Sequence, residues 1–223
     1  MSNYKGVKNK SSTIKSLSLT IGLLVITMTL VSFLAHGQLT IPTNKQETPE
    51  LSQKVKDYSP IVEKHLSEAG KEEYTSVVLA LMMQESGGRG NDPMQASESY
   101  CGEIGCIDKP ALSIKQGVAY FIKVLEKTNG DVKLALQSYN FGEGFIPYVK
   151  ERGGQYTEEL AIDFSAKMYE ELKHKNIYSC IREESAQHNA CYGDILYVEA
   201  VLAYYPNAVT YVDGDSVQVT LDN

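Results

Sequence analysis

Residues 16–37 contain no Asp, Glu, Lys or Arg, and most of them are apolar. A helix that crosses the hydrocarbon core of a bilayer needs about 20 mainly apolar residues, so this run is long enough to span a membrane. A helix of a soluble domain usually keeps a polar stripe, but this run is apolar on every face. The run therefore predicts a transmembrane segment, which leaves only the later sequence for a globular domain.

The charges on either side of this run predict its orientation. Residues 1–15 carry four Lys and no acidic residue, whereas residues 38–223 carry 17 basic and 28 acidic side chains. Positively charged flanks stay in the cytoplasm, so we expect a cytoplasmic stub at 1–15 and the bulk of the chain outside. The acidic balance also argues against a nucleic-acid partner, which would favour a basic surface.

Two interpretations of the apolar run are open. It is either a signal-anchor that stays in the membrane or a signal peptide cleaved after Ala35-His36-Gly37, a poor small-x-small site. Because the run is long for the apolar part of a signal peptide, we favour the anchor. The chain would then sit on the extracellular face of the cell membrane with a single-pass anchor, and cleavage would make it secreted.

The four cysteines fit an exported protein. Cys101 and Cys106 are five residues apart, Cys180 and Cys191 are eleven apart, and none forms a CxxC pair. The four His offer no zinc-ligand spacing with them, so two disulfides are favoured over a metal site, and no metal is expected. Local pairing within each pair is the simplest of three connectivities, which sequence alone leaves open.

The remaining sequence predicts an all-α domain at 51–206, preceded by a linker at 38–50 and followed by a short tail at 207–223. Apolar residues recur at helical spacing and show no strand-turn-strand rhythm. Helices are expected at about 51–68, 71–85, 118–125, 131–139, 157–172 and 194–205.

Local signals refine these boundaries. Pro60 predicts a helix start in the middle of 51–68, and the Ser113–Gln116 segment resembles a capping box. In the tail, two β-prone stretches around Asp213-Gly214-Asp215 predict a short hairpin over residues 209–221.

Glu85 is the most unusual residue of the helical region. On a helix turning 100° per residue, Leu81, Val78 and Tyr74 all lie within about 40° of it, so a carboxylate sits in the apolar stripe at the last helical turn. Desolvation and the negative end of the helix dipole both disfavour the charged form. This favours a Glu that stays protonated near neutral pH, as a general acid needs. The alternative is a Glu that turns to solvent or pairs with a nearby cation such as Arg89.

The loop after Glu85 adds a second carboxylate. Gly87, Gly88 and Gly90 give a loop whose backbone can come close to a ligand, and Asp92 follows seven residues after Glu85. Most glycoside hydrolases use two carboxylates that flank the sugar bond they cleave. A phosphate-binding loop is the competing idea, but no GK[ST] occurs and the loop follows a helix instead of preceding one.

These residues belong to a recognisable series. Glu85-Ser86, Met94-Gln95 and Ser138-Tyr139-Asn140 resemble the three-part signature of goose-type lysozymes and lytic transglycosylases. The chain more closely resembles the bacteriophage-type lysozyme-like domain of cell-wall hydrolases from Gram-positive conjugative elements. The resemblance covers roughly 51–206 and implies a lysozyme-like helical fold with an active-site groove.

The resemblance also implies roles for individual residues. Glu85 would be the general acid and Asp92 the second catalytic carboxylate, a departure from the transglycosylases, whose corresponding segment usually lacks one. The substrate-binding residues would be Ser86, Gln95, Tyr139 and Asn140. Tyr139 could instead be a core residue and Asn140 a plain helix cap. No cofactor is implied.

The expected function is that of an N-acetylmuramidase, a peptidoglycan hydrolase that cleaves the β-1,4 MurNAc-GlcNAc bond and thins the wall for a conjugation machine. The partners would be glycan strands, the membrane and proteins of the transfer apparatus. Relatives often continue into an NlpC/P60 cysteine-peptidase domain, and we expect that activity to be absent here. The alternatives are a lytic transglycosylase acting on the same glycan and a non-catalytic wall-binding scaffold protein.

Overall fold

The computed structural model describes residues 48–213, and every regular element in that range is a helix. The elements are α2 (Gln53–Ser67), η1 (Glu72–Tyr74), α3 (Thr75–Glu85), α4 (Ser97–Cys101), α5 (Pro110–Lys127), α6 (Val132–Phe141), α7 (Phe145–Lys150), α8 (Glu158–Leu172), η2 (Lys173–Lys175), α9 (Glu183–Gln187), α10 (Tyr197–Leu202) and α11 (Tyr205–Asp213). The expected all-α class is confirmed for this part of the chain.

The expected membrane segment lies outside the described residues. Between positions 48 and 213, no helix is both long enough and apolar enough to cross a bilayer. The stub at 1–15, the segment at 16–37 and the linker up to residue 47 stay predictions.

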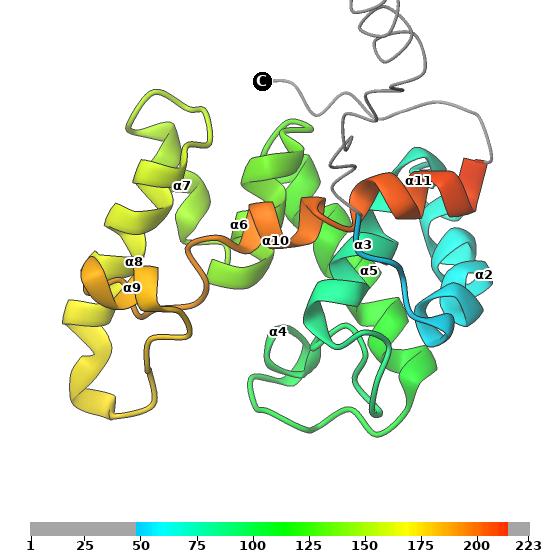
Figure 1. The fold of residues 1–223 in the computed structure, drawn as a ribbon, viewed down its shortest axis with the longest axis horizontal. Coiled ribbons are helices and arrows are strands. Elements are labelled where there is room, and N and C mark those ends of the chain that lie inside the picture. Colours follow the sequence, from blue (N-terminus) through cyan, green and yellow to red (C-terminus); the bar gives the residue numbers. More distant parts are fainter. Residues whose placement is uncertain (1–47, 214–223) are drawn as a thin grey trace, which may run out of the picture. The chain divides into compact units, whose positions relative to one another are not determined.

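Two hydrophobic clusters build the core, and α6 contributes to both. The larger cluster is built by α2, α3, α5, α10 and α11, and the smaller by α7, α8 and the segment before α10. α6 contributes Leu136 and Tyr139 to the larger cluster and Leu134 and Phe141 to the smaller one. Figure 1 shows α6 and α10 between the two groups of helices. The C-terminal end of α6 therefore lies where the clusters meet.

α3 is buried on all sides. Its first eight residues, from Thr75 to Met82, are all buried, and it contacts α2, α10 and α11. The sequence had indicated only one apolar face for this helix. Because solvent touches no side of its first two turns, a side chain at its end is held in a largely apolar setting.

Pro60 lies inside α2 and does not start a helix, so that prediction is wrong. A proline has no N–H to donate to the carbonyl four residues earlier, which here belongs to Lys56. The hydroxyl of Tyr211 on α11 donates a hydrogen bond of 3.0 Å to that carbonyl. The tertiary contact replaces the missing backbone bond and lets the helix continue through the proline.

The hairpin expected in the tail is wrong for residues 209–212, which belong to helix α11. α11 packs against α3, and the side chain of Asn207 accepts a hydrogen bond of 3.1 Å from the N–H of Leu51. The helical packing therefore continues to Asp213. The second half of the expected hairpin lies outside the described residues.

The capping box expected at Ser113 is also wrong. α5 starts earlier, with Pro110 in its first turn, so Ser113 lies within the helix and is fully buried. The helices expected from about 131 and 157 are confirmed, and Asp131 and Thr157 cap them, because each side chain accepts a hydrogen bond from the N–H three residues later, in Leu134 and Leu160 respectively.

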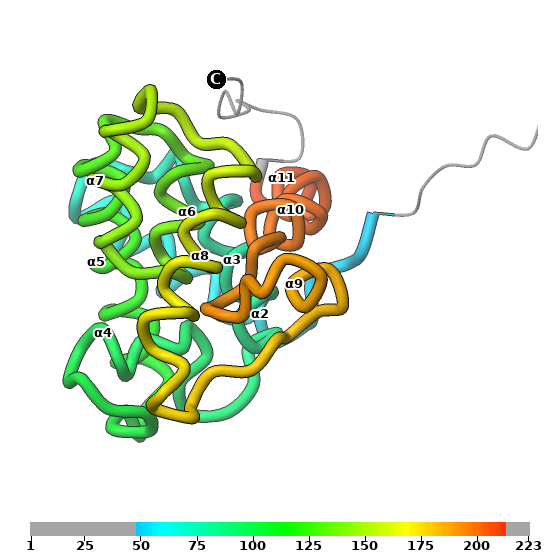
Figure 2. The backbone as a smooth tube through the Cα atoms, turned by 90° about the vertical axis from the view of Figure 1, so that its left-hand side faces the viewer, coloured from blue at the N-terminus to red at the C-terminus, as the bar shows by residue number. Residues whose placement is uncertain are grey.

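Both disulfides join the local pairs. Cys101–Cys106 closes the loop after α4, and Cys180–Cys191 closes the segment that contains α9. Figure 2 follows this second segment, in yellow and orange, from the end of α8 through α9 to α10.

The account of Pro60 predicts a coupling between α2 and α11. Tyr211→Phe should lower the free energy of unfolding by about 1 kcal/mol, the usual net contribution of one hydrogen bond. In a Pro60→Ala background the loss should be smaller, because the substituted residue supplies the missing helical N–H itself. Urea denaturation of the two single variants and the double variant tests this, and strictly additive effects would refute it.

Candidate active site

Glu85 is the last residue of α3, and two glycines turn the chain away from the helix directly after it. Gly87 and Gly88 have φ angles of +62° and +76°, which confirms the predicted helix stop. A Cβ atom at Gly88 would lie 2.9 Å from the Cβ of Lys54 on α2, so the loop can pack there only with a glycine. The carboxylate is thus placed by a buried helix and a tightly packed turn.

Burial raises the pKa of Glu85 to about 7. A hydrogen bond from Tyr197 works in the opposite direction, and the negative charge of Asp92 adds to the rise. A large share of Glu85 is therefore protonated at neutral pH, as expected of a general acid. Among residues 48–213 the structure shows no ion pair to Glu85, and Arg89 does not take that role.

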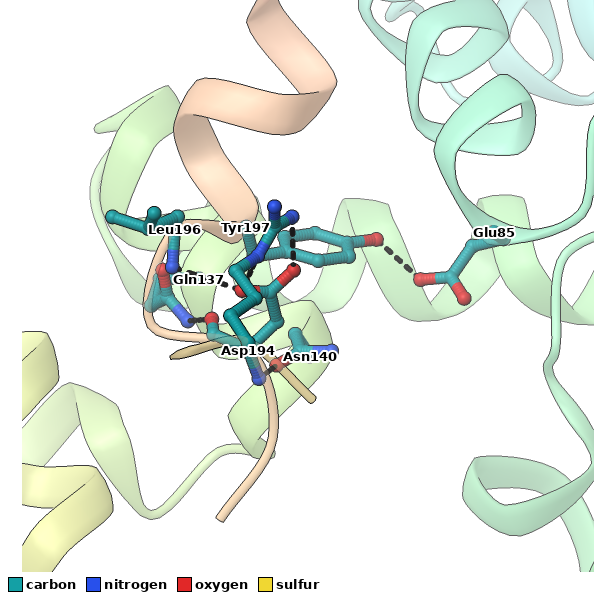
Figure 3. A network of polar contacts seen from close by, with 7 residues as sticks. Glu85, Gln137, Asn140, Asp194, Leu196 and Tyr197 are labelled. Atoms are coloured by element: carbon teal, nitrogen blue, oxygen red, sulfur yellow. Dashed lines mark hydrogen bonds and ion pairs between the residues drawn. The ribbon is translucent and has the colours of Figure 1, made fainter. Parts of the chain in front are cut away.

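The hydroxyl of Tyr197 donates a hydrogen bond to Oε1 of Glu85 (Figure 3). Tyr197 is the first residue of α10, lies 112 positions away in the sequence and is only 2% exposed. Burial raises its own pKa well above 10, so the phenol stays a donor. This contact was not predicted from the sequence, where nothing distinguished Tyr197 from the packing tyrosines around it.

Ser86 orders the loop that follows Glu85. Its Oγ donates to the carbonyl of Pro93 (2.8 Å) and accepts from the N–H groups of Gly88 (3.0 Å) and Arg89 (3.1 Å). These contacts are all internal to the loop, and Ser86 is buried. Its expected contact with substrate stays a prediction that its placement does not support.

Asp92 is the second anchor of the loop. Its Oδ1 accepts from the N–H of Ala96 (2.9 Å) and the hydroxyl of Ser113 (2.6 Å), and its Oδ2 accepts from the N–H (3.0 Å) and hydroxyl (2.6 Å) of Ser97. Burial alone would raise the pKa of Asp92, but these four hydrogen bonds outweigh it and lower the pKa below its usual value. Asp92 is therefore ionised at neutral pH, with both oxygens already engaged.

Met94 connects the loop to α5 and α6. The N–H of Met94 donates to Oγ of Ser113 (3.0 Å), and its carbonyl accepts from the hydroxyl of Tyr139 (2.8 Å). A Cβ atom at Gly117 of α5 would lie 2.4 Å from the Cβ of Met94, so only a glycine lets the loop come this close.

Gln95 adopts a left-handed backbone conformation, with φ at +48°, which is uncommon for a residue other than glycine. Its side-chain amide donates to the carbonyl of Asp92 (2.8 Å). Backbone strain of this kind often accompanies functional sites. Here it turns an exposed side chain towards the pocket next to Glu85.

Asn140 comes from the end of α6. Its Oδ1 accepts a hydrogen bond of 2.8 Å from the N–H of Asp194, which leaves the amide NH2 group of Asn140 as a donor (Figure 3). Its neighbour Tyr139 is buried and packs edge-on against Tyr120, with 5.3 Å between ring centroids. Tyr139 is thus both a core residue and part of the pocket wall.

These side chains surround a pocket of about 490 Å³. It is lined by Glu85, Gln95, Glu98, Ser99, Tyr120, Tyr139, Asn140, Phe141, Gly142 and Tyr192. Four of the six predicted site residues, Glu85, Gln95, Tyr139 and Asn140, therefore come together. Asp92 instead lines an adjoining cavity of about 190 Å³ that shares Gln95 and Glu98 with the first.

The pocket suits a neutral, hydroxyl-rich ligand. Amide and hydroxyl groups supply hydrogen bonds, and the aromatic rings of Tyr120 and Tyr192 offer apolar faces. Within residues 48–213, no group of three His, Cys, Asp or Glu side chains is placed to hold a metal ion. Glu85 supplies the pocket with a carboxyl whose pKa is strongly raised, and this points to proton transfer as the chemistry of the site.

Removing the Tyr197 hydroxyl should change the acidity of Glu85. In Tyr197→Phe the pKa of Glu85 should rise above 7, because the hydrogen bond that favours its ionised form is lost. Carboxyl ¹³C NMR titration measures this directly. Tyr74→Phe, at the opposite end of α3, is the matched control and should leave the titration unchanged; a fall in the Glu85 pKa of Tyr197→Phe would contradict this account.

The lowered pKa of Asp92 predicts acid lability. Its contribution to stability should be fully present above the unfolded-state pKa of about 4 and should vanish as pH falls through the lower folded-state value. Asp92→Asn should therefore be less stable than the wild type at pH 7, with a difference that shrinks by pH 3. Chemical denaturation at both pH values tests this. A difference of the same size at both pH values would contradict this account.

Several known proteins resemble the helical part of this chain. A model of the lysozyme-like family matches residues 52–205. The chain is 40% identical over 153 residues to the uncharacterized membrane protein YocA of Bacillus subtilis, with 67% of each chain covered. It is 39% identical over 158 residues to the bifunctional muramidase/DL-endopeptidase CwlT of the same organism, a match that covers 71% of this chain and 44% of CwlT.

Two further matches extend this set. The chain is 32% identical over 161 residues to pneumococcal vaccine antigen A of Streptococcus pneumoniae, covering 70% of this chain and 77% of that one. A Staphylococcus aureus crystal structure, described as similar to a lipoprotein of the NLP/P60 family, matches with a TM-score of 0.60 at 35% identity over 70% of this chain and 54% of that chain. Because the family model spans more than half of the chain, this protein belongs to the lysozyme-like family.

Proposed function

We propose that this protein is a peptidoglycan hydrolase that cuts the glycan strand, with Glu85 as the general acid. The observation that carries the proposal is a carboxyl with a pKa raised to about 7, at the edge of a pocket of about 490 Å³ lined by amides and tyrosines. A glycosidase needs a proton donor at the bond that breaks and a groove that holds neutral sugar rings. The site offers both.

The reaction follows from this placement. The protonated Glu85 gives its proton to the glycosidic oxygen as the bond from that oxygen to the sugar's C1 breaks. Positive charge develops on the sugar ring, and water adds at C1 while its proton returns to Glu85. The hydroxyl of Tyr197 holds the ionised form of Glu85 in place between these steps.

We assign the β-1,4 bond between MurNAc and GlcNAc as the target, which makes the protein an N-acetylmuramidase. Support comes from CwlT, which is described as a muramidase and an endopeptidase and whose match to this chain overlaps the lysozyme-like region. Gln95 and Asn140 would contact the glycan through hydrogen bonds, and Tyr139 would form part of the groove wall.

Asp92 has a structural part in addition to the catalytic one expected from the sequence. Its two oxygens accept four hydrogen bonds, so its main effect is to order the loop that carries Gln95. Its negative charge also helps to keep Glu85 protonated. Its role as the catalytic second carboxylate stays a prediction, and Glu98 is the other acidic residue that lines the pocket.

Because both oxygens of Asp92 already accept hydrogen bonds, a second candidate function is that of a lytic transglycosylase. In that reaction a hydroxyl of the muramic acid itself replaces water, and no second carboxylate is needed to activate water. Mass spectrometry of the released muropeptides separates the two. Reducing muramic ends indicate hydrolysis, whereas anhydro ends produced by an Asp92→Asn variant that is still active indicate transglycosylation.

We further propose that residues 16–37 anchor the enzyme to the outer face of the cell membrane, where it would thin the wall for a conjugation machine. The support is the uncharged apolar run and the four Lys before it. The transfer role comes from the family resemblance, and it would make proteins of the transfer apparatus its partners.

Glu85→Gln separates an enzyme from a non-catalytic wall-binding scaffold. It should abolish the release of muropeptides from purified peptidoglycan, because Gln cannot donate the proton. It should also stabilise the fold at pH 8–9 by up to about 3 kcal/mol, since the pKa of Glu85 rises from 4.5 to about 7 on folding and its ionised form is disfavoured there. A Glu85→Gln variant that still releases muropeptides would rule out this acid, and a wild-type protein that releases none would favour the scaffold.

A further inference from the structure

An ion pair lies one layer behind the residues that touch Glu85. Nε and Nη2 of Arg182 donate to Oδ1 and Oδ2 of Asp194, both at 2.7 Å. The Asp194 side chain is only 6% exposed, and that of Arg182 is 33% exposed. A bidentate pair of this kind fixes the orientation of both planar groups, which a single contact would not do.

Asp194 uses its backbone as well as its carboxylate. Its N–H donates to Oδ1 of Asn140 (2.8 Å), and its carbonyl accepts from Nε2 of Gln137 (2.9 Å) and from the N–H of Tyr197 (3.2 Å). Its Oδ1 also accepts the N–H of Leu196 (3.0 Å). Figure 3 shows Asp194 at the centre of these contacts. This residue therefore joins the end of α6 to the start of α10.

Both elements held by Asp194 carry site residues. Asn140 lines the pocket, and its amide orientation is set by the bond to the Asp194 N–H. Tyr197 follows Asp194 by three residues, and its hydroxyl reaches Glu85. A rotation of Asp194 would move both side chains together.

Arg182 reaches Asp194 from a segment that has no contact of its own with Glu85 among the described residues. This segment is tied to the stretch before α10 by the Cys180–Cys191 disulfide, by the ion pair, by a ring contact between Tyr178 and Tyr192, and by a backbone hydrogen bond from Ala190 to Ser185. The disulfide ends three residues before Asp194, whereas the ion pair acts on Asp194 itself. The ion pair therefore adds a side-chain restraint at Asp194 to the backbone hydrogen bonds that join it to Asn140 and Gln137.

We propose that Arg182 is a positioning residue, which acts through Asp194 to hold Tyr197 against Glu85 and Asn140 against the pocket. The effect on glycan cleavage rests on the proposed function; the effect on Glu85 does not. Six titratable groups face Glu85 or share its pocket: Tyr197 from α10, Tyr139 from α6, Tyr120 from α5, Tyr192 from the stretch before α10, Asp92 from the loop and Glu98 from α4. Of these groups, Tyr197 is the one whose hydroxyl donates to Glu85, and it lies on the helix whose start Arg182 holds through Asp194.

The test uses Arg182→Gln in the full chain, with kcat/KM on purified peptidoglycan measured from pH 4 to 9. Loss of the Tyr197 hydrogen bond removes an interaction that lowers the Glu85 pKa. The alkaline limb should therefore move to higher pH, while the plateau should fall about tenfold, the equivalent of about 1.4 kcal/mol. Arg182→Lys keeps the positive charge but cannot form the bidentate pair of hydrogen bonds, so its alkaline limb should shift less, in the same direction.

The matched control is Arg152→Gln. Arg152 is partly exposed, donates to the carbonyl of Tyr148 and stacks on its ring, away from the pocket. Arg152→Gln should change neither the position of the alkaline limb nor the plateau value of kcat/KM. If Arg182→Gln lowers the melting temperature but leaves the alkaline limb of the kcat/KM profile in place, the role of Arg182 is purely structural and the proposal is overturned.

A ¹³C titration of the Glu85 carboxyl gives a readout that does not need catalysis. The proposal requires its pKa to rise in Arg182→Gln, even if the wild type proves inactive on peptidoglycan; an unchanged pKa overturns it. If Arg182→Gln does not fold, Arg182→Lys decides by the same titration. Failure of the proposed function would instead appear as a wild type that releases no muropeptides but retains the Arg182-dependent pKa.

Discussion

The burial of α3 is the constraint on which the site depends. A helix with no solvent-facing side in its first two turns delivers Glu85 into surroundings that disfavour its charge. The carboxyl is kept near the surface only because α3 ends there, at a turn that requires glycine. The raised pKa of Glu85 is therefore a consequence of the burial of α3 and of the position at which the helix ends.

The pKa values of Glu85 and Asp92, which lie seven residues apart, shift in opposite directions. Burial dominates at Glu85 and raises its pKa, whereas at Asp92 four hydrogen bonds overcome burial and lower it. One group is thus prepared to give up a proton near neutral pH, and the other stays ionised and organises the loop. The separation of roles arises from local environment, because the chemical groups are the same.

The pocket forms where the two hydrophobic clusters meet. α6 belongs to both, and near its end Tyr139 packs in the larger cluster and Phe141 in the smaller one, with Asn140 between them. The loop with Met94 reaches them because Gly117 leaves room for it. From the other side, α10 brings Tyr197, and the Arg182–Asp194 pair fixes the start of that helix. Residues from distant parts of the sequence therefore converge on one carboxyl.

The sequence by itself determined the features that depend on near neighbours: the helical class, the stop at Gly87-Gly88, the caps at Asp131 and Thr157, and the apolar surroundings of Glu85. It failed where distant contacts outweigh local signals. The β-prone residues 209–212 are helical because they pack on α3, Pro60 is tolerated because Tyr211 bonds the freed carbonyl, and Ser113 binds Asp92 and Met94 instead of capping a helix. Tyr197 could not be identified, because its one decisive hydrogen bond spans 112 residues and only tertiary packing creates it.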